Sequence, residues 1–148
     1  MEIQSDFRDL LESFNKHKVE YLIVGGYALA FHGAPRYTGD LDIFINASAD
    51  NADRILNALK EFGFGSAGLS VQDFSEPNKV IQLGYPPVRI DIVTSISGVS
   101  WAEAFQNRVG GKYGETPVFF IGREQFVVNK RTVGRKRDLA DLEALGEA

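Results

Sequence analysis

The stretch from Tyr21 to Ile45, YLIVGGYALAFHGAPRYTGDLDIFI, decides the fold of this chain. It predicts a short apolar strand, a turn at Gly25-Gly26, a short helix, and a second strand that carries Asp40 and Asp42. Side chains two residues apart on a strand point to the same side of a sheet. The two carboxylates should therefore share one face, where they repel each other, and folding alone gives no reason to place them there.

A divalent cation would remove that repulsion, because Mg²⁺ prefers hard oxygen ligands such as carboxylates. The Gly-Gly turn would begin a helix, whose free N–H groups and positive dipole end attract phosphate. A phosphate cradle beside paired metal ligands is typical of a site for a nucleoside triphosphate.

Asp91 supplies a third carboxylate, in a predicted strand at residues 88–93. Taken alone, it could equally face solvent on an edge strand. Beside Asp40 and Asp42 it would complete a set of acids on neighbouring strands. Such a set can hold two Mg²⁺ ions, or Mn²⁺ in their place, about 4 Å apart, on the attacking and leaving oxygens of an in-line displacement.

The rest of the chain predicts a mixed β-sheet with helices packed against it, of α/β or α+β class, in a single domain over residues 1–148. Apolar side chains at helical spacing predict helices at residues 6–17, 27–32, 49–61, 101–107 and 135–145. Apolar runs predict strands at residues 21–24, 41–45, 79–83, 88–93 and 116–121. Residues 63–78 predict mostly a loop, and residues 123–130 are ambiguous.

The bulk composition excludes several classes of protein. With 16 basic and 20 acidic residues the net charge is -4, which argues against a protein that coats nucleic acid generally. The absence of cysteine excludes disulfides, thiolate metal sites and cysteine nucleophiles. No signal-peptide pattern and no membrane-spanning apolar run are found. We therefore expect a cytoplasmic protein with no membrane partner.

The order of these motifs resembles the nucleotidyltransferase superfamily that includes DNA polymerase beta. Four segments, GGYALAFHG, RYTGDLDIFI, PPVRIDIVTSISGV and NKRTVGRKRDLADLEAL, are similar to small bacterial nucleotidyltransferases related to the AbiEii toxin-like and minimal enzymes of abortive-infection systems. The resemblance covers nearly the whole chain. It implies a nucleotidyltransferase fold and metal-dependent transfer of an NMP from an NTP to a hydroxyl, with release of pyrophosphate.

The resemblance also implies roles for the motif residues. Gly25 and Gly26 match the turn that lets the triphosphate approach the backbone. Asp40 and Asp42 match the two ligands shared by both metal ions. Asp91 matches the third acid, which helps activate the acceptor hydroxyl; a carboxylate beside that hydroxyl can orient it or take its proton during attack on the α-phosphate.

Basic and hydroxyl side chains near these motifs are further candidates for nucleotide binding. Arg36 and Thr38 precede the acidic strand and could hold phosphate oxygens, or simply anchor a loop. Arg89 shares the face of Asp91, where an ion pair is at least as well supported as a contact with substrate.

A basic run at residues 130–137 leads into the last predicted helix. Such a run is usually a solvated face. The resemblance places matching cations near the nucleotide, so Lys130 and Arg135 are predicted to contact phosphate or the acceptor. Asp138 and Asp141 are expected to cap the last helix or to pair within it.

The acceptor stays open between the end of a tRNA, a protein side chain and a small molecule such as an aminoglycoside. The chain has little room for a substrate domain, so a homodimer or an antitoxin partner could supply one. A different class of function, a non-catalytic nucleotide-binding or toxin–antitoxin interaction module on the same fold, is the alternative hypothesis.

Overall fold

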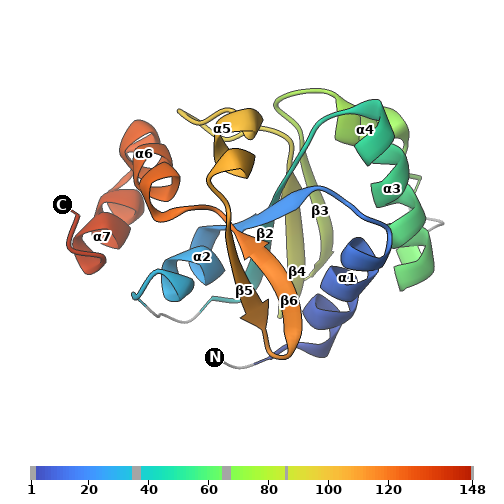
Figure 1. The fold of residues 1–148 in the computed structure, drawn as a ribbon, viewed down its shortest axis with the longest axis horizontal. Helices are drawn as coiled ribbons and strands as arrows, with labels where there is room; N and C mark the ends of the chain where they lie inside the picture. The colour runs from blue at the N-terminus through green and yellow to red at the C-terminus, as the bar shows by residue number, and fades with distance from the viewer. Residues whose placement is uncertain (1–2, 35–37, 65–67, 86, 148) are drawn as a thin grey trace.

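The computed structural model describes residues 3–34, 38–64, 68–85 and 87–147. Its centre is a mixed six-stranded sheet in the order β3-β4-β2-β1-β6-β5, with helices on both faces (Figure 1). The strands are β1 (Tyr21–Val24), β2 (Asp40–Ile45), β3 (Val80–Tyr85), β4 (Val88–Val93), β5 (Val109–Tyr113) and β6 (Thr116–Phe120). The pairs β1–β6 and β2–β4 are parallel, and the other neighbours are antiparallel. The predicted mixed sheet of α/β class is confirmed.

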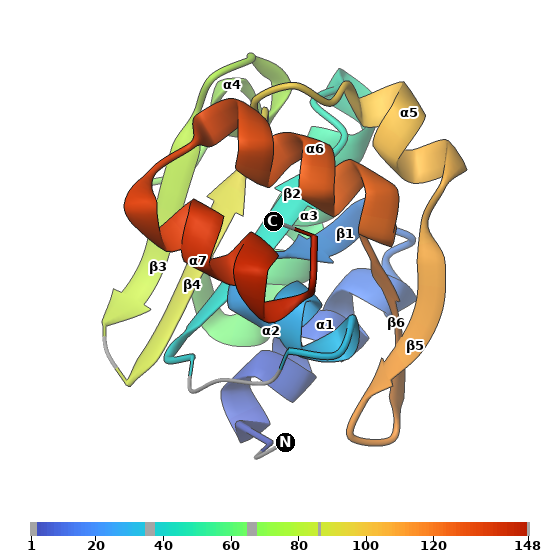
Figure 2. The same ribbon diagram turned by 90° about the vertical axis from the view of Figure 1, so that its left-hand side faces the viewer.

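The helices form two groups on opposite sides of the sheet. Their bounds are α1 (Ser5–Lys16), α2 (Gly25–Phe31), α3 (Ala49–Leu59), α4 (Val71–Ser75), α5 (Trp101–Gln106), α6 (Arg123–Val133) and α7 (Lys136–Ala144). A π-helical segment, Lys60–Phe64, continues α3. Figure 2 shows α6 and α7 in front of β1, β2 and β4, with α1 and α3 behind the sheet. Among the described residues, no helix is long and apolar enough to cross a bilayer.

The alternation of β2 sets the two faces of the sheet. Leu41, Ile43 and Ile45 are fully buried in the main core, together with the apolar side chains of α1 and α3. Asp40 and Asp42 occupy the intervening positions and so face the side of α6 and α7. A slip of one residue in the pairing of β2 would bury the acids in the core, so the register is strongly specified.

A smaller apolar cluster lies on the same face as the acids. Leu22 of β1 and Phe44 of β2 are buried there against Ala104 of α5. Trp101 packs edge-on against Phe44, with ring centroids 5.1 Å apart, and stacks on Phe105. The start of α5 therefore closes one end of the acid-bearing face with apolar side chains.

Asn51, at the start of α3, joins that helix to two strands. Its side chain accepts a hydrogen bond from the backbone N–H of Glu20 and donates to the carbonyls of Glu20 and Asn46, at distances of 2.8–3.0 Å. The side chain is fully buried. These three bonds hold the beginning of β1 and the end of β2 together behind the sheet.

Three elements differ from the sequence expectations. Strand β5 was not expected, because VGGKY contains two glycines, which are rare in strands. Here a Cβ at Gly111 would lie 2.8 Å from the ring of Phe31, so the glycine allows a close approach. Helix α4 lies in the predicted loop, and its N-cap residue Ser70 donates its backbone N–H to Asp73. Helix α6 is complete and runs to Val133.

Candidate active site

The three predicted acids come together on one face of two neighbouring parallel strands. In the register of β2 and β4, Asp42 lies beside Asp91, and Asp40 lies beside Arg89. Because neighbours in register point to the same side, all three carboxylates share the face covered by α6 and α7. Asp91 is buried, with 8% of its surface exposed. The edge-strand alternative for Asp91 is therefore wrong, since β4 lies between β3 and β2.

Asp42 is the electrostatic centre of this site. Its pKa is raised to about 6, first by burial and then by the negative charges of Asp91 and Asp40. The positive charges of Lys130 and Arg89 oppose this shift. A negative charge at Asp42 is thus disfavoured unless a cation is close, which fits a carboxylate that binds a cationic group.

Arg89 makes a two-pronged ion pair with Asp91 along β4. Its Nε and Nη2 atoms lie 3.1 and 3.0 Å from the two carboxylate oxygens. The predicted ion-pair role of Arg89 is confirmed. Arg89 thereby neutralises Asp91 and orients its carboxylate along the strand.

The acid set fits a divalent cation in the chemistry of its donors and in its arrangement on one face. In the part of the chain that the structure describes, however, no three carboxylates or imidazoles converge closely enough to ligate one ion. Asp91 in particular is held by Arg89. Asp40 and Asp42 are the better-suited ligands, and a contribution of Asp91 requires its carboxylate to be shared with Arg89.

The two glycines lie directly against the acidic strand. Gly25 has a φ of +68°, and a Cβ there would fall 2.9 Å from Cγ of Asp42 and closer still to its Oδ2. A Cβ on Gly26 would lie 2.7 Å from the hydroxyl of Thr38. No separate turn precedes the helix, because Gly25 is the first residue of α2. Only glycines allow the backbone to approach Asp42 and Thr38 this closely.

Thr38 and Arg36 are the two other candidate residues before β2. The Thr38 hydroxyl donates a hydrogen bond to the carbonyl of Asp40, at 3.2 Å, and so anchors the loop. Arg36 lies outside the described residues, so its nucleotide contact stays a prediction.

Lys130 of α6 acts on the charge of Asp42, and Arg135 is engaged with Asp138 of α7. The charge of Lys130 lowers the pKa of Asp42, and its Nζ pairs with Asp138 and Asp141 of α7. Arg135 is exposed and pairs with Asp138, whose carboxylate also accepts the Arg135 backbone N–H at the start of α7. Capping by Asp138 is confirmed, but the reach of both acids across to α6 was not expected.

Helix α6 is fixed over the site by residues that the sequence analysis did not single out. Asn129 donates a hydrogen bond of 2.9 Å to the carbonyl of Ser97, in the segment that follows β4. A Cβ on Gly98 would lie 3.0 Å from Cβ of Thr132, so this segment packs tightly against α6. The one signal in the sequence was the stretch SISG at residues 95–98, shortly after the Asp91 strand.

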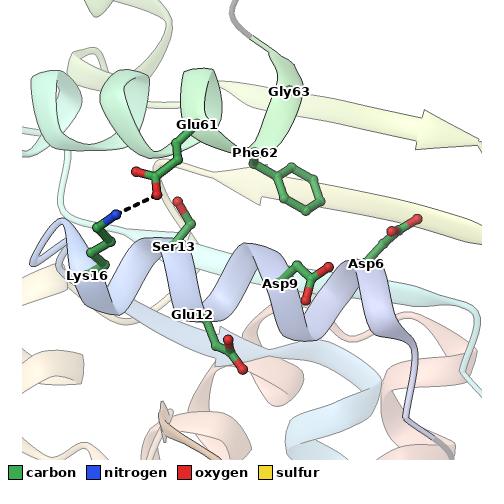
Figure 3. Close-up of a pocket in the computed structure, with 8 residues that line it drawn as sticks. All are labelled: Asp6, Asp9, Glu12, Ser13, Lys16, Glu61, Phe62 and Gly63. Atoms are coloured by element: carbon green, nitrogen blue, oxygen red, sulfur yellow. Dashed lines mark hydrogen bonds and ion pairs between the residues drawn. The ribbon is translucent and has the colours of Figure 1, made fainter.

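A hollow of about 730 Å³ lies elsewhere, between α1 and the π-helical segment (Figure 3). Asp6, Asp9 and Glu12 of α1 line it, and Lys16 pairs with Glu61 at 2.7 Å across it. This hollow is on the side of the sheet opposite to the three acids. None of the predicted site residues lines it.

Comparisons with known proteins agree with this geometry. The family described as "Nucleotidyl transferase AbiEii toxin, Type IV TA system" matches residues 8–107. No curated protein matches the chain. Among solved structures, a Thermotoga maritima protein classed as a nucleotidyltransferase is similar, with a TM-score of 0.61, 14% identity and coverage of 99% of this chain and 97% of that one. The lincosamide antibiotic adenylyltransferase LnuA, solved with lincomycin, has a TM-score of 0.57, 14% identity and coverage of 99% and 98%.

At these identities the solved structures establish the fold, and the family match, which covers more than half of the chain, establishes the relationship. That match contains the two glycines and all three acids of the site. The chain belongs to the AbiEii nucleotidyl transferase toxin family.

Proposed function

We propose that this protein is a metal-dependent nucleotidyltransferase, which transfers an NMP from an NTP to a hydroxyl and releases pyrophosphate. One observation carries the proposal: Asp42 and Asp91 are neighbours in register on β2 and β4, with the backbone of Gly25 against Asp42. Membership of a nucleotidyltransferase family supports it. Burial of charged carboxylates side by side is costly in free energy, and a site for a metal-bound triphosphate would explain why the fold tolerates that cost.

Each site residue has a role in the proposed reaction. Asp40 and Asp42, with Asp91, would hold Mg²⁺ or Mn²⁺, which neutralises phosphate charge when bound. The close backbone approach at Gly25 and Gly26 brings the start of α2 beside the acids, where its free N–H groups would donate to phosphate oxygens.

Asp91 is the group that would receive the proton of the acceptor hydroxyl or orient that hydroxyl for attack on the α-phosphate. Arg89 fixes the direction of its carboxylate. Lys130 supplies positive charge for the triphosphate, and Arg36, Thr38 and Arg135 are proposed as further nucleotide contacts.

For the acceptor we favour an RNA end, with a protein side chain or a small molecule as the other outcomes of the test. Residues 131–137 are all exposed and include four cations, Arg131, Arg135, Lys136 and Arg137. On a chain of net charge -4, this local basic surface suits a polyanion close to the site. We further propose a cytoplasmic setting and an antitoxin partner or a second copy of the chain.

A transfer assay with labelled NTPs tests the proposal. The chain is incubated with each NTP labelled on the α-phosphate, Mg²⁺, and separate pools of RNA, protein and small molecules. Wild type should label one pool, and Asp42→Asn should abolish the label. Asp53→Asn, on an exposed position of α3, is the matched control and should behave as wild type. The proposal is wrong if no pool is labelled, or if Asp42→Asn labels as well as wild type.

The second candidate is a non-catalytic nucleotide-binding or interaction module. The ion pair between Arg89 and Asp91 favours it, because that pair occupies the carboxylate assigned to the acceptor hydroxyl. Calorimetry combined with detection of pyrophosphate separates the two functions. A module binds NTP without releasing pyrophosphate with any acceptor pool, whereas the transferase releases one pyrophosphate for each NMP transferred.

A further inference from the structure

A group of buried charges joins α6 to α7 beside the acid-bearing face. Lys130 Nζ lies 3.2 Å from Oδ1 of Asp138 and 3.1 Å from Oδ2 of Asp141. The side chains are almost inaccessible, with exposed fractions of 12% for Lys130, 1% for Asp138 and 6% for Asp141. We call these three residues the Lys130 cluster.

The Lys130 cluster contains more charge than is needed to hold the two helices together. Asp138 already accepts hydrogen bonds from the backbone N–H and the guanidinium of Arg135. Burial favours the neutral form of Asp138, but the hydrogen bonds from Arg135 and Lys130 outweigh it and hold the pKa at about 2. Apolar residues of similar volume would join two helices at no greater cost. Burial of a lysine with two acids is therefore not explained by packing alone.

The position of the Lys130 cluster indicates what its charge is for. Helix α6 is tied to the segment after β4 by the Asn129–Ser97 hydrogen bond, which holds it over the strand of Asp91. From there the charge of Lys130 acts on Asp42. An ammonium group has three N–H donors, and two acids leave one donor for a further partner.

We propose that Asp138 and Asp141 are positioning residues, which hold the Lys130 ammonium in place for the phosphate oxygens of the bound NTP. This inference rests on the proposed function. Lysine is a flexible point charge, so an ammonium that is already held in one position loses less freedom when it binds phosphate.

The proposal predicts an effect opposite in sign to that of simple electrostatics. Asp141 is negative, so its replacement by asparagine should strengthen the binding of a triphosphate if only total charge matters. If Asp141 acts by holding Lys130, the same replacement should weaken binding. A purely structural role would lower the stability of the protein and leave the affinity of the folded molecules unchanged.

The experiment is a double-mutant cycle on Asp141 and Lys130. Binding of the non-hydrolysable α,β-methylene analogue of each NTP, with Mg²⁺, is measured by calorimetry on wild type, Asp141→Asn, Lys130→Met and the double variant. Urea unfolding of each protein is measured in parallel. Glu143→Gln, at an exposed position of α7, is the matched control and should bind as wild type.

We expect Asp141→Asn to weaken binding roughly tenfold, as for a charge-assisted hydrogen bond that loses its geometry. In the Lys130→Met background the same change should have less than a twofold effect, or should strengthen binding. Wild-type affinity for Asp141→Asn, tighter binding, or an equal loss in both backgrounds overturns the positioning role and leaves the proposed function standing. If wild type binds no analogue, both fall. If Asp141→Asn does not fold, Asp141→Glu takes its place in the cycle with the same expectation, because the longer side chain displaces the carboxylate.

Discussion

Substitution of Gly25 by alanine tests whether the close approach of α2 to Asp42 positions the reacting carboxylate. The new Cβ would meet Asp42 inside van der Waals contact, because its distance to Cγ would be 2.9 Å where ordinary contact begins at 3.4 Å. Its distance to Oδ2 would be shorter still, so the carboxylate would have to move by roughly 1 Å. A displacement of that size at a reacting group lowers the rate about 100-fold.

The effect on stability has two parts. Alanine at a φ of +68° is strained by roughly 1–2 kcal/mol. Overpacking against Asp42 adds about 1–3 kcal/mol. The free energy of unfolding should therefore fall by about 2–5 kcal/mol in total.

Gly114→Ala provides the matched control. Gly114, in the turn between β5 and β6, has a φ of +61°, and the nearest atoms to a Cβ there would belong to Ile3, at 3.5 Å, an ordinary contact distance. It should lose only the roughly 1–2 kcal/mol of backbone strain and keep full activity per folded molecule.

The assays are urea unfolding and the rate of NMP transfer, measured at temperatures where both variants are folded. The reasoning is refuted if Gly25→Ala transfers NMP within threefold of the rate of Gly114→Ala. It is also refuted if both variants lose the same free energy of unfolding, since the contact with Asp42 would then cost nothing.

Three further predictions concern stability. The pKa of Asp42 is raised from 3.8 to about 6, so its contribution to the free energy of unfolding is favourable below about pH 4 and is lost as the pH rises through 6. Asp42→Asn should therefore stabilise the protein at pH 8 in metal-free buffer, by up to about 3 kcal/mol in urea unfolding. An unchanged pH profile of stability would contradict this. The pKa of Asp138 is lowered instead, to about 2, so its contribution to the free energy of unfolding is present above about pH 4 and is lost as the pH falls toward 2. Asp138→Asn should therefore flatten the fall in stability with decreasing pH, and a pH profile of stability like that of wild type would refute the assignment. Asn51→Ala removes the side-chain partner of the Glu20 N–H and of the Glu20 and Asn46 carbonyls, which are partly buried, and should cost about 2–4 kcal/mol at unchanged activity per folded molecule. A loss below about 0.5 kcal/mol would show that water replaces the side chain.

The placement of the acids could be predicted from sequence because it depends on local periodicity. Asp40 and Asp42 alternate with Leu41 and Ile43, and a period of two permits only one assignment of faces once the apolar set is buried. The short distance between Gly25 and Asp42 follows from a strand that passes directly into a helix beside its antiparallel neighbour.

The remaining features depend on tertiary packing that no local pattern encodes. The pairing of Lys130 with Asp141 follows from the angle at which α7 folds back on α6. The left-handed Gly134 sets this angle, but a glycine after a helix does not specify the direction of the next helix. Strand β5 forms because β6 offers it hydrogen bonds and Phe120 fits over Gly111, not because VGGKY favours strand. Neither could be predicted from propensities.

The strand order has a consequence for how the molecule folds. Strands β2, β3 and β4 all lie between Asp40 and Val93, whereas β1 pairs with the more distant β6 through Ile23 and Phe120. Strand pairings between segments so far apart in sequence form late in folding, because the entropy of loop closure opposes them. During synthesis the three acids can therefore assemble before α6 leaves the ribosome. Lys130 follows all six strands along the chain, so a nascent chain has the acids and Arg89 before it has Lys130, the second cation that opposes the repulsion at Asp42.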